Sequence, residues 1–144
     1  MNQAKFIFLV ISVFFVSQSC FGQKRDAIDF KEDGIIITHR MVECDNASGY
    51  DEKVKLISIQ NTTDEPINVT WTQGFWINQE CRTCDNAEEH QASHTVVGGQ
   101  TISGSCDKTD GYRNLRITLD LLGYEEKNPI TDHKMLHITL TKPE

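Results

Sequence analysis

Period-two alternation of apolar and polar side chains is the feature that most constrains the fold of this chain. Ile67, Val69 and Trp71 alternate with polar residues, and the same alternation recurs in residues 115–121 and 136–141. Successive side chains of a β-strand point to opposite faces, so this pattern is typical of strands that bury one face. No segment after residue 22 predicts a convincing helix.

The alternation and the turn residues between the alternating segments predict seven strands. Residues 26–33 are interpreted as a charged lead-in, and the expected strands are 35–44, 53–60, 67–77, 93–97, 100–106, 115–121 and 136–141. The polar turn at 61–66 and the Gly98-Gly99 pair each predict a hairpin between the strands beside them. Seven short antiparallel strands favour an all-β fold of two packed sheets, with a small barrel as the alternative.

The strand, turn and strand unit around Asn61-Thr62-Thr63-Asp64-Glu65-Pro66, with Trp71 downstream, resembles the exported bacterial immunoglobulin-like proteins. The resemblance covers most of the chain and implies an immunoglobulin-like β-sandwich of about seven antiparallel strands. Trp71 lies between Cys44 and Cys106, as in antibody domains, but a second cysteine pair between them departs from that pattern. Such folds host adhesion, carbohydrate binding, assembly and chaperone work, so the fold does not name a function.

The first 22 residues predict an export signal. Lys5 precedes an apolar run, Phe6 to Val16, that is too short to span a bilayer. Small residues before Gln23 fit cleavage after Gly22, which would leave residues 23–144 as a single domain. An alternative is a lipid anchor on Cys20. We expect a secreted or periplasmic protein, or one at the cell surface, with no transmembrane segment after removal of the signal.

The charge of the chain disfavours one class of partner. The formal net charge is −7, and removal of Lys5 with the signal would leave 13 basic and 21 acidic residues, a net charge of −8. An acidic surface repels phosphate backbones, so we expect no nucleic-acid partner. The simplest interpretation of the acidic charge is that it keeps the protein soluble.

The four cysteines after the signal predict two disulfides. In a small exported domain, paired cysteines are the default, and four cysteines allow three connectivities. We favour Cys81 with Cys84 and Cys44 with Cys106. A redox role for the Cys81-Arg82-Thr83-Cys84 motif is disfavoured, because the acidic residues that follow it would raise the pKa of a thiol.

Metal binding is the alternative use of these residues. Cys81, Cys84, His90 and His94 offer two sulfur and two nitrogen ligands for zinc, although only five residues separate the two pairs. A copper site would instead use alternate residues of the first and last strands, namely His39, Met41, His133, Met135 and His137. Against copper, Leu136, Ile138 and Leu140 are expected to fill the core face of the last strand, leaving its His and Met residues outward.

The long irregular stretch from Gln79 to His94 is the predicted binding region. Long loops in compact domains are often functional, and alternation turns Trp76 outward beside this one. The candidate binding residues are Trp76, Arg82, Glu88 and Glu89. We therefore expect a non-enzymatic binding or assembly module of the bacterial cell envelope or surface, with no catalytic residues, no cofactor and an unknown protein or glycan partner.

Overall fold

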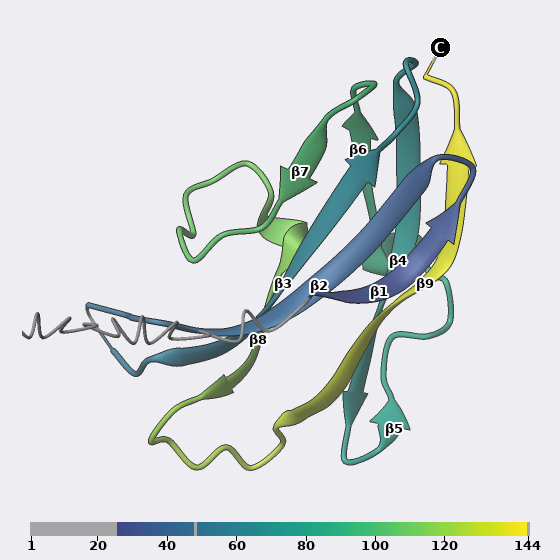
Figure 1. Ribbon diagram of the computed structural model, residues 1–144. Coiled ribbons are helices and arrows are strands. Elements are labelled where there is room, and N and C mark those ends of the chain that lie inside the picture. The colour runs from purple at the N-terminus through teal and green to yellow at the C-terminus, as the bar shows by residue number, and fades with distance from the viewer. Residues whose placement is uncertain (1–25, 48, 144) are drawn as a thin grey trace, which may run out of the picture.

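The computed structural model describes residues 26–47 and 49–143, which form two antiparallel β-sheets packed face to face (Figure 1). The first sheet contains β1 (Ala27–Glu32), β2 (Ile35–Cys44), β3 (Glu52–Asn61), β7 (Thr101–Ser103) and β8 (Arg116–Leu121). The second contains β4 (Ile67–Ile77), β5 (Glu80–Cys81), β6 (Gln91–Val96) and β9 (Ile130–Thr141). Two short 3-10 helices, η1 (Glu88–His90) and η2 (Arg113–Leu115), lie in the connections. The all-β sandwich confirms the predicted fold class.

The structure has nine strands where the sequence analysis predicted seven. The additional strands are β1 and β5. The expected lead-in forms β1 because Asp33 and Gly34, with φ angles of 46° and 80°, make a tight turn that pairs β1 with β2. β5 is a two-residue strand on the end of β4. The predicted signal peptide, with Cys20 inside it, lies outside the described residues.

Two predicted hairpins are wrong, because each turn carries the chain from one sheet to the other. β3 and β4 lie in different sheets, as do β6 and β7. Asn61, which is fully buried, ties the two crossings together: its Nδ2 donates to the carbonyl oxygens of Glu65, at 2.7 Å, and Val96, at 2.9 Å. Gly98 packs so closely on the backbone of Asp64 that a Cβ atom there would collide with it.

The hydrophobic core lies between the two sheets. Trp71 is fully buried in this core, as the alternation predicted, and Phe75 on the same strand packs against the core. The other buried members of the core come from both sheets and are Ile35, Ile37, Ile57, Ile59, Val69, Ala92, Val96, Ile102, Leu115 and Ile117. Burial of this apolar surface is the main force that holds the sheets together.

A bulge in β9 reverses the predicted orientation of its histidine and methionine residues. His137 has a φ of 50°. Around it β9 advances three residues, from Leu136 to Thr139, while the paired stretch of β4 spans two, between Thr72 and Thr70. Before the bulge, His133 and Met135 face the core; after it, Ile138 and Leu140 do. The expected outward row is therefore wrong for His133, which is 1% exposed, whereas His137 is exposed.

His133 is held as a neutral side chain inside the sandwich. Its Nε2 lies 2.6 Å from Oε1 of Gln73, and its backbone oxygen accepts a hydrogen bond from Lys55 Nζ at 2.8 Å. Burial lowers the pKa of His133 to about 3, helped by the charges of Lys55 and His39 and opposed by that of Asp132. The unfolded chain, whose histidine has an ordinary pKa of 6.5, therefore binds this proton more readily than the folded protein.

We predict that this buried histidine makes the fold sensitive to mild acid. The stability that neutral His133 contributes is complete above pH 6.5 and is lost as the pH falls from 6.5 to 3. At pH 5 the loss amounts to about 2 kcal/mol. The measurement is urea unfolding at pH 7 and pH 5. His133→Gln should lose less stability between these two pH values than the wild type, whereas the control His137→Asn, at the exposed bulge, should lose the same amount. An unchanged pH dependence in His133→Gln would contradict the assignment.

Candidate binding site

The connection between β7 and β8, residues 104–115, folds over the outer face of the first sheet. Its two ends meet: Gly104 donates its N–H to the oxygen of Ile57 at 3.0 Å, and a Cβ atom on Gly104 would collide with the backbone of Leu115. The connection thus leaves and returns at one point, as compact surface loops do. In Figure 1 it projects beside the first sheet as the green loop before β8.

A disulfide fastens this loop to the end of β2. Cys44 and Cys106 are bonded with their Cα atoms 5.5 Å apart, in the pairing that the sequence analysis favoured. Cys44 is 2% exposed and packs with Val54 and Leu56 in a small apolar cluster that is separate from the main core. The disulfide of antibody domains bridges the two sheets. In contrast, this bond joins the end of β2 to the connection between β7 and β8 on the outer side of the first sheet.

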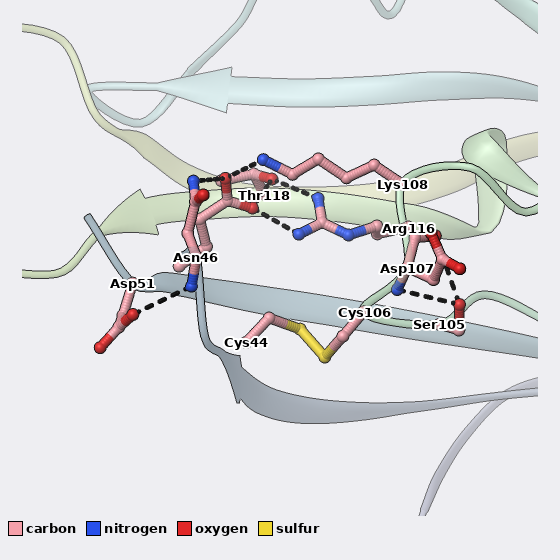
Figure 2. Close-up of polar contacts among 10 residues, drawn as sticks. Cys44, Asn46, Asp51, Ser105, Cys106, Asp107, Lys108, Arg116 and Thr118 are labelled. Atoms are coloured by element: carbon pink, nitrogen blue, oxygen red, sulfur yellow. Dashed lines mark hydrogen bonds and ion pairs between the residues drawn. A yellow bond between two sulfur atoms is a disulfide. The ribbon is translucent and has the colours of Figure 1, made fainter. Parts of the chain in front are cut away.

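A buried carboxylate beneath the loop collects most of its polar contacts. Glu52 is 5% exposed and accepts short hydrogen bonds from Lys108 and Arg116, both of which also form ion pairs with it. Thr118 donates to the same carboxylate at 3.2 Å, and Asn46 does so at 3.5 Å. Figure 2 shows these four side chains converging from both sides of the disulfide. The Glu52 cluster, defined by these five residues, therefore joins the loop to β3 and β8.

Opposing effects of burial and of neighbouring cations set the ionisation of Glu52. Burial alone would raise the pKa of Glu52, but hydrogen bonds from Lys108 and Arg116, together with their charges, lower it to about 2. Glu52 is therefore ionised at neutral pH. The Arg116 side chain is only 8% exposed, and its Nε is buried without a hydrogen-bond partner among the described residues. One donor of a buried guanidinium thus remains unused, which is unusual for a charged group.

A pocket of about 370 Å³ opens beside this cluster. It is lined by Asp107, Lys108, Arg113 and Arg116. The carboxylate of Asp107 is occupied by Thr109, whose backbone N–H and hydroxyl both donate to it. The guanidinium of Arg113 makes no hydrogen bond or ion pair within the described part of the chain. The pocket therefore offers cationic donors that are not fully engaged, an arrangement suited to binding an anion.

The predicted binding region, Gln79 to His94, is more regular than its sequence suggested. It contains β5, η1 and the start of β6. Cys81 and Cys84 are joined as a disulfide, with their Cα atoms 5.9 Å apart. The Thr83 hydroxyl between them accepts the N–H of Phe75 at 2.9 Å and donates to the oxygen of Gln73 at 2.5 Å. This segment therefore completes the edge of β4 between the stretches that pair with β6 and β5.

The four candidate binding residues of that region make separate contacts. Trp76 is partly exposed, with Lys134 Nζ 5.2 Å from its ring centroid. Arg82 is paired with Glu80 at 2.9 Å. Glu88 and Glu89 are exposed on η1. Among the residues described, no contact joins these four side chains to one another, so the structure does not gather them into one site.

The proposed metal ligands are likewise dispersed. Both sulfurs of the zinc set belong to the Cys81–Cys84 disulfide. His90 Nδ1 lies 3.0 Å from Asp85, while the His94 ring lies 5.8 Å from that of Trp71. Of the copper set, His133 is buried and His39 is bonded to Asp29. Within residues 26–47 and 49–143, no group of three or more His, Cys, Asp or Glu side chains is arranged to hold a metal ion.

Sequence reasoning missed the residues of the pocket. Arg116 and Thr118 occupy the polar positions of the alternating segment 115–121, and the sequence analysis gave them no role in binding. The available signal was the favoured Cys44–Cys106 pairing, because that bond brings the residues after Cys106 close to those near the start of β3. The Cys44–Cys106 pairing would therefore have predicted that Lys108 lies near Glu52.

Comparison with known proteins finds no matching family model, no similar curated protein and no similar solved structure. In the described part of the chain, no helix is long and apolar enough to cross a membrane. The site must therefore be interpreted from its own geometry.

Proposed function

We propose that this protein is an exported, disulfide-stabilised binding or assembly module of the bacterial cell envelope or surface, acting without catalysis. The two disulfides support the proposal, because such bonds persist in oxidising compartments and stabilise small exported domains. The predicted export signal gives independent support from the sequence.

The proposal includes an immunoglobulin-like character for the sandwich. β2 and β3 are neighbours in one sheet, β4 crosses to the other, β7 and β8 return beside β3, and β9 pairs with β4. This alternation between sheets, with the buried Trp71 on β4, supports the resemblance. The departure is that neither disulfide bridges the two sheets, which separates this chain from antibody-type domains.

One observation carries the binding role: a surface loop held rigid over a sheet and presenting a pocket. The two ends of residues 104–115 meet near Gly104, the Cys44–Cys106 bond fixes the segment close to its start, and Lys108 ties it to the Glu52 cluster. Binding residues commonly lie on loops that a rigid scaffold positions. Rigidity before binding also reduces the conformational entropy lost when a partner is engaged.

Site-specific cross-linking in the native envelope tests this function. A photoreactive amino acid at Thr109, on the pocket loop, should capture a partner molecule, whereas the same group at Glu88, exposed on η1, should not. Capture only at Glu88 would move the interface to the region first predicted, and capture at neither position would contradict a binding role through these surfaces. Mass spectrometry of the same material should show a gain of four hydrogens on reduction of the two disulfides.

A further inference from the structure

We propose that the pocket beside the Glu52 cluster binds a compact oxyanion, a carboxylate, phosphate or sulfate group, through Arg113, Arg116 and Lys108. This inference rests on the proposed binding function and names the chemical class that the site recognises. It is carried by the guanidinium of Arg113, which has no hydrogen-bond or ion-pair partner among the described residues, at a pocket that Lys108 and Arg116 also line.

The charge balance of the site favours an anion over a cation. Three cationic side chains line the pocket, against the carboxylates of Asp107 and of Glu52 behind it, which leaves a local charge of +1 in a chain whose net charge is −7. Asp110, on the same loop, is not among the residues that line the pocket, and it accepts hydrogen bonds from Ser105 and from the N–H of Tyr112. Among the four residues that line the pocket, three are cationic and one is acidic.

The geometry of the donors favours an oxyanion in particular. Guanidinium groups present planar, paired N–H donors that match the oxygens of a carboxylate or phosphate. Arg116 is held in place because one terminal nitrogen donates to Glu52 and the other donates to Thr118, while its buried Nε has no partner among the described residues. Arg113 begins η2 only three residues earlier and is exposed, so it can adjust to a ligand. A pocket of about 370 Å³ accommodates such a group together with part of the molecule that carries it.

Calorimetric titration of the mature protein with inorganic phosphate, sulfate and acetate, at constant ionic strength set with sodium chloride, tests this site. We expect saturable binding of at least one of the three, at one site per chain. Arg113→Gln should weaken it about tenfold, the effect of removing one hydrogen bond between charged groups. The matched control is Arg82→Gln, which removes the same charge from an exposed arginine paired with Glu80 outside the pocket. Binding in the control should equal that of the wild type.

Three results would overturn the proposal: no saturable binding of any of the three anions, equal affinity in Arg113→Gln and wild type, or equal weakening in both arginine variants. Thermal unfolding of each variant checks that the fold is intact, and no partner of the exposed Arg113 side chain lies in the described part of the chain, so its replacement removes no described contact. Cross-linking at Thr109 separates this inference from the proposed function. A captured partner without anion binding would refute the ligand class alone, whereas anion binding without a captured partner would refute the proposed function alone.

Discussion

Replacement of both Cys44 and Cys106 by alanine is expected to lower the free energy of unfolding by about 4 kcal/mol. The bond joins residues 62 positions apart, so it restricts a long loop of the unfolded chain, and the stabilisation by a disulfide increases with the length of the loop it closes. Cys44 is also buried against Val54 and Leu56, so the variant loses part of this packing. Equilibrium unfolding in guanidinium chloride, followed by tryptophan fluorescence and circular dichroism, measures the change.

The second disulfide provides an internal control for the loop-length argument. Cys81 and Cys84 are separated by three positions, so their bond closes a very short loop, and the same relation gives less than about 2 kcal/mol for Cys81→Ala with Cys84→Ala. The predicted order of stability is therefore wild type, then the variant lacking the short bond, then the one lacking the long bond. Equal losses in the two variants would show that loop length does not govern the contribution of these bonds.

The alternation of side chains predicted the strands well because burial of one face is a local property of each segment. β4 and β8 appear close to their expected positions, since apolar residues alternate with polar ones along them, and β2 appears where a run of β-branched residues begins. β1 was missed because only Phe30 among its residues packs against the core, while Ile28 is 65% exposed. The Asp33-Gly34 turn was nevertheless a readable hairpin signal.

The assignment of strands to sheets was not accessible from the same pattern. A polar turn reports that the chain reverses, but it does not report whether the next strand pairs with the previous one or crosses to the opposite sheet. Here the crossing at 61–66 depends on Asn61, whose buried amide binds carbonyl groups of two separate segments. In β9 a single bulge at His137 exchanged the two faces, and no glycine marked it.

The candidate binding pocket was hidden for a related reason. Glu52, Lys108 and Arg116 come from three separate parts of the chain, and each alone is typical of a solvated surface residue. Only the loop folded over the sheet buries the carboxylate and the guanidinium together. Buried charge of this kind depends on tertiary contacts, so a sequence pattern that reports the period of a strand does not reveal it.

Glu52→Ala is expected to lower the free energy of unfolding by about 3 to 5 kcal/mol, because it leaves the buried Arg116 guanidinium without its counter-ion. The Lys108 pair contributes little to this loss, since the Lys108 side chain is 57% exposed. The control is Glu43→Ala, which removes an exposed carboxylate on β2 and should change the free energy of unfolding by less than about 0.5 kcal/mol. Chemical denaturation at pH 7 gives both values.

The double variant Glu52→Leu with Arg116→Met distinguishes the loss of a favourable pair from the cost of an unpaired charge. If the cost of the unpaired charge dominates, removing both charges should restore most of the stability lost in Glu52→Ala, because apolar side chains of similar size can replace a buried ion pair at little cost. The pH profile gives a second readout: the pKa of Glu52 is lowered from 4.5 to about 2, so its contribution is complete above pH 4.5 and is lost between pH 4.5 and 2. The double variant should lack this acid-dependent loss. A double variant as unstable as Glu52→Ala would instead mean that the ion pair itself holds the loop to the sheet.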